Sequence, residues 1–404
     1  MAPLSFGEAI RGFTIDKSSF RPEHDHMDQT SAHPAITAAQ ALAPELSARA
    51  AEMDTARRLP SDLAITMAAA GVFRAITPKS LGGMESSPAV FMAMLETLGI
   101  ANASASWCAM IACTSTLAAA HLPPDIAAKI FSDPEMIAAG IFAPMGEAVS
   151  DGDDYILTGR WPWGSGSANS HWVGLGAFIE GETAPRMLFL PTSEAQLLDT
   201  WHVAGLRGTG SGDMAVKNIR VPKSHSIPSL FSAPVETGPL YTFPPFGLLG
   251  IGVASVALGN AQGALEEFHQ LASAKKNQGS SRTLSERSGI QARYAENTAK
   301  LKAARAYMAD ELAQTWDQAQ ADGAQSVERR AALRLACTHM ARTAAEVCRV
   351  LYDMGGGAVL YEDSPIQRRF RDAHAITQHI VTAPASYELF GRVLFGQPTD
   401  ASMI

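Results

Sequence analysis

Apolar residues recur every three to four positions through residues 35–131, in a stretch that is rich in alanine. This spacing places the apolar side chains on one face of a helix. It predicts helices over residues 87–98, 104–121 and 125–131, and Pro123-Pro124 ends one helix and begins the next. The glycine and proline residues at 78–83 predict a break before these helices.

The pattern changes at about residue 136, where short apolar runs begin to alternate with turn residues. The runs occupy 137–142, 155–159, 172–178, 186–190 and 214–221. Gly-Asp-Asp at 152–154 and Gly-Glu at 181–182 are typical of turns between strands. The sequence therefore predicts a barrel-like β-domain in the middle of the chain.

Helical spacing returns after Pro245 and continues nearly to the last residue. The long segments are 247–275, 286–321, 327–354 and 366–393. Their lengths and short connections are typical of a four-helix bundle. We therefore expect an α+β protein with an N-terminal arm (1–34), a helical domain (35–135), a central β-domain (136–236) and a C-terminal four-helix bundle (237–404).

Composition limits the partners of the protein. The 404 residues are 47% hydrophobic and 18% charged, as in an ordinary globular protein, and the net charge is −8. This charge gives no support for nucleic acid or an anionic membrane as a partner. The uncharged stretch between Glu236 and Glu266 is long enough to span a membrane, but its many small residues and its prolines favour a central helix of the bundle.

The cysteines fit no metal-binding spacing, and all four lie in apolar helical stretches: Cys108, Cys113, Cys337 and Cys348. We expect free buried thiols, which suits a reducing cytoplasm. The first thirty residues are polar and carry acidic residues early, so no secretory signal is expected there. The sequence thus predicts a cytoplasmic protein without a metal site.

Four of the six tryptophans fall between residues 161 and 201. Three of them lie among glycines and serines, in Gly159-Arg-Trp-Pro-Trp-Gly-Ser-Gly-Ser167 and Trp201-His-Val-Ala-Gly-Leu-Arg-Gly-Thr-Gly-Ser211, and the fourth is Trp172. Flexible turns beside large rings favour a flat ligand that lies close to the backbone. The alternative is a β-domain core that happens to use tryptophan. No dinucleotide fingerprint occurs, and Gly355-Gly-Gly357 either brings amides to a phosphate or simply joins two helices.

Three groups of residues resemble the acyl-CoA dehydrogenase superfamily. The first comprises Leu59-Pro60, Ala70-Gly-Val-Phe73 and Leu81-Gly-Gly83, and the last is Ser364-Pro-Ile-Gln-Arg-Arg-Phe-Arg-Asp372. The middle group is the pair of tryptophan motifs, which resembles one branch, the oxygenase components of two-component flavin-dependent monooxygenases. The resemblance covers about residues 40–395 and implies an acyl-CoA dehydrogenase-like fold.

One position separates two kinds of flavin chemistry within this resemblance. In the commonest acyl-CoA dehydrogenases, a glutamate about eight residues after the Arg-Asp motif removes a proton from the substrate. Here that position is Ile380, its neighbour is His379, and the other known location of the base has no acidic residue before Glu266. Isoleucine accepts no proton, which argues against dehydrogenation. As the monooxygenase branch implies, His379 would act as base or acid, or bond a flavin C4a-(hydro)peroxide.

The resemblance implies roles for further residues. Ser165 would lie near flavin N5 and C4a and stabilise the oxygen adduct, while Trp163 and Trp201 would cover the flavin ring and exclude water. The bland alternatives are a turn serine and core tryptophans. Candidates for the flavin phosphate are arginines, which bind phosphate through paired hydrogen bonds but are often solvated helix charges: Arg282, Arg368 and Arg369.

One departure from the branch concerns the substrate. Members that hydroxylate phenols carry a histidine about eight residues after an Ala/Ser-Trp pair. Here the pair is Ser106-Trp107 and the matching position is Ser115, whereas the nearest histidine is His121. The substrate is therefore open among amines, sulfur compounds and other ring systems, unless His121 reaches the site.

Together these residues predict an oxygenase component that uses reduced FMN or FAD from a separate NAD(P)H-dependent reductase, together with O₂. It would oxygenate a small aromatic or heteroatom-containing substrate, and the family implies a homotetramer. A flavin-dependent acyl-CoA dehydrogenase with an unrecognised base is the first alternative. The second is a non-catalytic partner subunit of the same fold.

Overall fold

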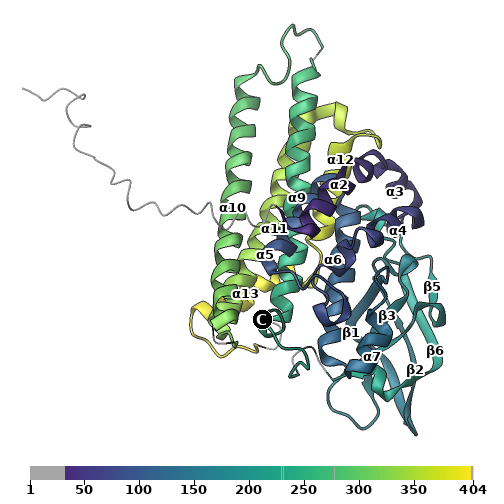
Figure 1. Cartoon of the computed structure of the whole chain (residues 1–404). Coiled ribbons are helices and arrows are strands. Elements are labelled where there is room, and N and C mark those ends of the chain that lie inside the picture. Colours follow the sequence, from purple (N-terminus) through teal and green to yellow (C-terminus); the bar gives the residue numbers. More distant parts are fainter. Residues whose placement is uncertain (1–31, 229, 231, 277, 322, 402–403) are drawn as a thin grey trace, which may run out of the picture.

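The computed structural model of the protein describes residues 32–228, 230, 232–276, 278–321, 323–401 and 404. The N-terminal arm predicted at 1–34 lies almost entirely outside these residues. Figure 1 shows long helices standing side by side, with a sheet against their lower half and shorter helices between the two.

Six helices form the N-terminal part of the described chain. They are α2 (Pro34–Ala48), α3 (Ala50–Ala56), α4 (Ser61–Ala69), α5 (Pro88–Ala101), α6 (Ala103–Thr116) and α7 (Pro124–Phe131). Ser87 caps α5 by accepting a hydrogen bond from the Val90 amide, and Asn102 caps α6 in the same way. The helices predicted at 87–98, 104–121 and 125–131 are confirmed, except that the end of the 104–121 segment is a 3₁₀ turn (Leu117–His121).

A single seven-stranded sheet follows, with the order β5-β6-β2-β1-β3-β4-β7. The strands are β1 (Ala138–Asp151), β2 (Asp154–Trp161), β3 (Trp172–Ile179), β4 (Arg186–Pro191), β5 (Gln196–Leu198), β6 (Asp213–Pro222) and β7 (Ser226–Ile227). All neighbours are antiparallel except β1 and β3, which are parallel. The five predicted strands are present, whereas the short β5 and β7 were not predicted. Because no ladder joins β5 to β7 among the described residues, the predicted barrel-like closure is not confirmed.

The C-terminal part consists of the short α8 (Pro239–Thr242) and three long helices, α9 (Pro245–Ala274), α10 (Ser288–Ala321) and α11 (Val327–Gly355). The apolar α9 is central, because it packs against α11 on one side and against α5 of the N-terminal part on another. Glycine permits the second contact: a methyl group on Gly259 would collide with the Glu96 carbonyl oxygen. The most apolar windows of α9 and of residues 103–121, both long enough to cross a membrane, are each 94% buried inside the protein.

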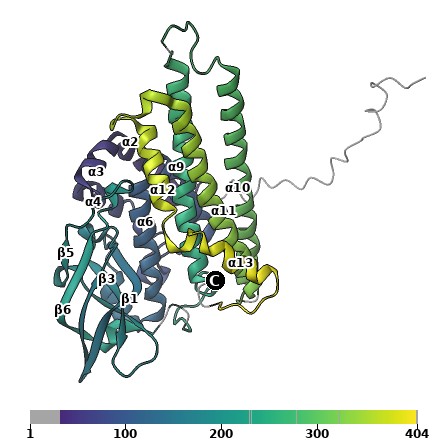
Figure 2. The same ribbon diagram turned by 180° about the vertical axis from the view of Figure 1, so that it is seen from behind.

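The prediction of a single fourth bundle helix at 366–393 is wrong, because this segment forms two helices. α12 (Pro365–Ile376) and α13 (Ala385–Leu394) are joined by a 3₁₀ turn at Ile380–Thr382. Pro384 disfavours helical backbone in the residue before it, and His379 is extended, with ψ of 136°. Figure 2 shows α12 and α13 along the back of the bundle. His379 therefore lies in a turn that packs against α9 and α11, not on a helix.

One hydrophobic core runs through the N-terminal helices and the bundle, and a second lies within the sheet. Trp161 is fully buried in the sheet core and donates its indole N–H to the Gly176 carbonyl. This tryptophan is thus core packing, as the alternative interpretation of the cluster proposed. All four cysteines are free and buried, as predicted.

Candidate flavin and oxygen site

The two tryptophan motifs lie side by side. β2 pairs with β6 up to Trp161 and Met214, and the loop that follows β2 contacts the loop that precedes β6. The Gly164 amide donates to the Gly212 carbonyl at 2.9 Å, and the Gly166 amide donates to the Thr209 carbonyl at 3.0 Å. Sequence segments that are forty residues apart therefore build one surface.

Trp163 projects from this surface. Its side chain is 68% exposed, and its φ of 66° lies in the left-handed region that disfavours residues with a side chain. Backbone strain of this kind persists where the surroundings enforce it, and it gathers at functional sites. An exposed indole two residues from the buried Ser165 suits a flat ligand ring that lies against this loop.

A chain of hydroxyl groups extends behind Trp163. Ser165 Oγ lies 2.6 Å from Ser211 Oγ, which lies 2.6 Å from Thr209 Oγ1. Thr209 donates to the Leu206 carbonyl at 2.8 Å, and Trp107 Nε1–H donates to Ser165 Oγ at 3.1 Å. The two ends thus fix the direction of the chain, with Ser165 donating to Ser211 and Ser211 donating to Thr209. A lone pair remains on Ser165 Oγ for a further donor.

His379 reaches this cluster through Trp107. The two rings meet edge to face, with their centroids 5.5 Å apart. His379 Nδ1 accepts a hydrogen bond from the Val381 amide at 3.4 Å, so in the neutral ring Nε2 carries the hydrogen. Burial lowers the pKa of His379 to about 4, and the positive charge of Arg334 makes a smaller contribution in the same direction. The imidazole is therefore neutral near pH 7 and carries an N–H group at Nε2.

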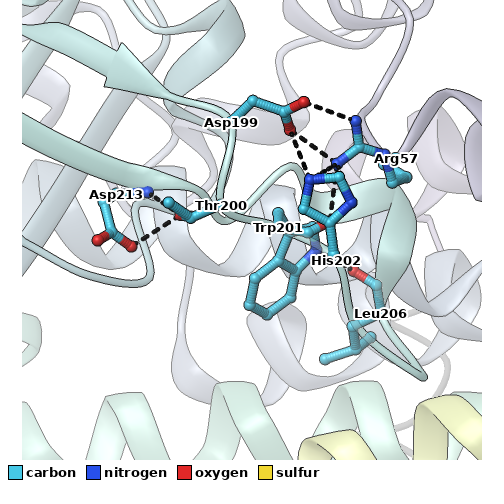
Figure 3. Close-up of polar contacts among 7 residues, drawn as sticks. All are labelled: Arg57, Asp199, Thr200, Trp201, His202, Leu206 and Asp213. Atoms are coloured by element: carbon cyan, nitrogen blue, oxygen red, sulfur yellow. Dashed lines mark hydrogen bonds and ion pairs between the residues drawn. The ribbon is translucent and has the colours of Figure 1, made fainter.

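Trp201 braces its own loop, as Figure 3 shows. Its indole N–H donates to the Leu206 carbonyl at 3.1 Å, and Arg57 binds the Trp201 carbonyl as well as the Asp199 carboxylate. The indole is half-buried against the helical core. Its proposed role as a cover for the flavin ring stays a prediction.

The same loop is fastened to α12. The buried Asp372 carboxylate accepts a hydrogen bond from the Leu206 amide at 2.6 Å, and Arg371 Nη1 donates to the Ala204 carbonyl at 2.6 Å. Burial raises the pKa of Asp372 to about 6. A methyl group on Gly205 would collide with the Arg371 carbonyl, so the loop lies directly on the helix. The Arg-Asp motif therefore positions the loop that carries Thr209 and Ser211.

The three predicted phosphate arginines have different surroundings. Arg369 is 4% exposed and binds the Gly99 and Ile100 carbonyls and Glu267. These partners hold α12 against α5 and α9, so the geometry favours a structural role for this side chain over phosphate binding. Arg368 is half-buried, and burial lowers its pKa. Arg282 is exposed in the hairpin between α9 and α10.

A cavity of about 480 Å³ lies between the sheet and the bundle. Thr114 and Leu117 contribute from the end of α6, Phe142 from β1, and Phe246 from the start of α9. Arg186 is its one charged lining residue within the described parts of the chain. Ser115 is buried, with its hydroxyl facing Gly140 of β1, and His121 pairs with Ser232. Neither residue lines this cavity.

A second cavity, also of about 480 Å³, is basic. Lys275, Arg287 and Arg293 line it together with the glycines at 355–357. Lys275 Nζ donates to the Gly355 carbonyl at 2.7 Å. Cations beside an open glycine turn suit a phosphate group.

Sequence reasoning brought together Ser165, Trp163 and His379, and the structure adds partners that it missed. Ser211 and Thr209 stood inside the quoted motif, and Trp107 stood in the Ser-Trp pair. None of the three was assigned a role, because their hydrogen bonds cross between segments that are distant in sequence.

Comparisons with known proteins agree with this geometry. A family model described as acyl-CoA dehydrogenase, N-terminal domain, matches residues 32–122, and one described as acyl-CoA dehydrogenase, C-terminal domain, matches residues 251–384. An indole-3-acetate monooxygenase of Pseudomonas putida is 33% identical over 87% of this chain and 90% of that protein. A protein of the same name from Acinetobacter baumannii is 31% identical over 88% and 93%. The crystal structure of 3-HSA hydroxylase from Rhodococcus sp. RHA1 matches with a TM-score of 0.86 and 25% identity, over 93% of this chain and 100% of that one.

The chain therefore belongs to the acyl-CoA dehydrogenase superfamily. Within it, the protein is an oxygenase component of the flavin-dependent monooxygenases, and its cofactor is a reduced flavin. The relatives favour this function over dehydrogenation and over a non-catalytic role, in agreement with the absence of a carboxylate at Ile380.

Proposed function

We propose that the protein adds one oxygen atom from O₂ to an indole-type aromatic acid, using reduced flavin that a separate NAD(P)H-dependent reductase supplies in the cytoplasm. One observation carries the choice of substrate. The first cavity is almost wholly apolar, and its charged lining residue is the cation Arg186. Such a cavity suits a flat hydrophobic ring with a single negative group.

The lining of the cavity favours an indole over a phenol. A phenol gains reactivity when a base removes its proton, whereas an indole ring is already electron-rich. α6 contributes Thr114, whose hydroxyl donates back to the Met110 carbonyl at 2.9 Å, and no histidine lines the cavity among the described residues. Two relatives carry the name indole-3-acetate monooxygenase, and a structural neighbour was solved with FMN and indole.

Arg186 has donors available for a carboxylate. Its Nε and Nη2 atoms donate to the Ser226 hydroxyl at 3.3 and 3.2 Å, and its Nη1 atom lies 3.6 Å from Glu182. A guanidinium carries five N–H groups, so these partners do not saturate it. A substrate carboxylate would compete with Glu182 for the same cation.

The residues of the oxygen site have complementary tasks. Reduced flavin supplies activation of O₂ when it is bound. Ser165 would bond the edge of the flavin ring, Trp163 and Trp201 would exclude water from it, and His379 would donate its Nε2 hydrogen to the transferring oxygen. The neutral state of His379 supports the donor role over that of a general acid.

We propose that the flavin phosphates bind basic groups of the bundle. The candidates are the cations that line the second cavity, Lys275, Arg287 and Arg293. Arg282 and Arg368 are further candidates. Both FMN and FAD remain compatible, because neighbours were solved with either FMN or FADH₂. We also propose a homotetramer. Leu394 and Phe395 at the end of α13 are 75% and 84% exposed, and this apolar surface supports burial against another subunit.

Oxygen transfer is tested by labelling. The protein is mixed with reduced FMN or FAD, indole-3-acetate and ¹⁸O₂, and the product is analysed by mass spectrometry. We expect one ¹⁸O atom in the product and no reaction without protein. Oxidised substrate that carries no ¹⁸O would instead identify a dehydrogenase.

The carboxylate contact is tested by two opposite substitutions. Arg186→Gln should weaken binding of indole-3-acetate by about ten-fold, because it removes a charge-assisted hydrogen bond. Glu182→Gln should strengthen it, because the competing anion is gone. Binding is measured by calorimetry, with indole as the neutral control, whose affinity neither substitution should change. Equal losses for indole and indole-3-acetate in the Arg186 variant would contradict the assignment.

A further inference from the structure

Arg334 of α11 is a buried cation at the junction of three segments. Arg334 is only 3% exposed. Nη2 donates to the Val381 carbonyl at 3.3 Å, and the guanidinium carbon lies 5.8 Å from the centre of the Phe246 ring and 6.0 Å from that of Phe390. Cation–π contacts of this kind are strongest when they are desolvated.

Each contact leads to a different part of the protein. Val381 lies in the turn that carries His379, Phe246 lines the proposed substrate cavity, and Phe390 belongs to α13. Room for the side chain is left by Gly250 of α9, where a methyl group would lie 3.3 Å from Arg334 Cδ. One side chain therefore touches both the histidine turn and the wall of the cavity.

We propose that Arg334 is a positioning residue for oxygen transfer, which fixes the His379 turn against the cavity wall and holds the imidazole in its neutral, N–H-donating form. The inference rests on the proposed role of His379, but its contacts are independent of any ligand. Because the Val381 amide binds His379 Nδ1 and the Val381 carbonyl binds Arg334, one peptide segment links the cation to the ring.

The charges around His379 support this role. Its ring faces the neutral Trp107 from α6, and α11 supplies Arg334 and the uncharged Thr338, which also donates to the Val381 carbonyl at 3.3 Å. Among the described residues, no carboxylate forms an ion pair with the imidazole. Burial and the Arg334 charge act in the same direction and lower the pKa of His379 to about 4. A proton on His379 is thus disfavoured on two grounds.

The test separates the charge from the hydrogen bond. Arg334→Met removes the charge and nearly preserves the volume, whereas Thr338→Val removes the other bond to the Val381 carbonyl and keeps the charge. The pKa of His379 is measured by NMR on the ¹⁵N-histidine-labelled full chain without flavin, and His379→Gln assigns the signal. We expect the pKa to rise by about 1 in Arg334→Met and to stay unchanged in Thr338→Val.

The same variants are assayed for product formed per flavin oxidised, which should fall in Arg334→Met. An unchanged pKa in a folded Arg334→Met protein, or an equal change in both variants, would overturn the inference. If thermal melting shows that Arg334→Met does not fold, Arg334→Gln takes its place with the same expected rise, and Arg334→Lys should keep the low value. The imidazole stays neutral at pH 7 even with a pKa raised by about 1, so the loss of yield would come from the turn that Arg334 no longer holds. A shifted pKa with unchanged product yield would therefore overturn Arg334 as a positioning residue for oxygen transfer.

Discussion

Replacing His379 by alanine is expected to lower the product formed per flavin oxidised by about 100-fold, while reduced flavin is still consumed by O₂. The reason lies in the neutral ring. Its Nδ1 atom is held by the Val381 amide, so Nε2 carries the hydrogen that would bond the transferring oxygen. Without that donor, oxygen leaves as hydrogen peroxide instead of reaching the substrate.

Yield and peroxide are measured together, by chromatography of the product and a peroxidase assay of the peroxide. His374→Ala is the matched control, because this exposed histidine packs on Phe370 of the same helix and does not contact Trp107. His379→Gln should recover part of the yield, since glutamine retains an N–H donor. Equal yields in the two alanine variants would remove His379 from the oxygen site.

The pKa of His379 also determines how the product yield per flavin should depend on pH. The ring is neutral above its pKa of about 4 and becomes cationic below it. Yield per flavin should therefore be flat between pH 6 and 8, whereas a histidine with the ordinary value near 6.5 would change charge within that range. A step in the wild-type yield near pH 6.5 that His379→Gln abolishes would contradict the neutral-donor assignment.

The sequence predicted the helices and most strands because their signals are local. Periodicity over 87–98 or 327–354 depends on side chains within the same segment. The break in 366–393 was missed although Pro384 is a local signal for it, because the apolar spacing continues across the turn in which His379 is extended. The packing of α9 against α5 was equally hidden, since it depends on Gly259 meeting the Glu96 carbonyl from a distant segment.

The same contrast between local signals and contacts of distant segments holds for the site. Ser165 and His379 could be chosen because a resemblance assigns roles to their motifs. Arg369 shows the limit of this reasoning, because the carbonyls of Gly99 and Ile100 that bind it are about 270 residues away in the sequence. A phosphate-binding arginine and a structural one look alike until such partners are known. The hydroxyl chain could not be predicted for the same reason, since it depends on how the loop after β2 meets the loop before β6.

Ser165→Ala is expected to have the second large effect, lowering product yield per flavin by about 10- to 100-fold with a matching rise in hydrogen peroxide. The hydroxyl has two tasks that alanine cannot perform. It accepts the Trp107 indole N–H, and it donates to Ser211, which leaves a lone pair for the flavin edge. Its loss also strands the buried Trp107 N–H, which costs about 1–3 kcal/mol of stability.

Ser170→Ala is the control, because Ser170 lies in the same loop but bonds Ser167 and Thr192 outside the hydroxyl chain. Ser211→Ala should give an intermediate loss, since Ser165 keeps its hydroxyl but loses the partner that directs it. The double variant Ser165→Ala/Ser211→Ala should be no worse than Ser165→Ala alone, because Ser211 acts on the flavin through Ser165. Additive losses would mean that the two serines act separately, and the fixed direction of the chain would then have no part in oxygen transfer.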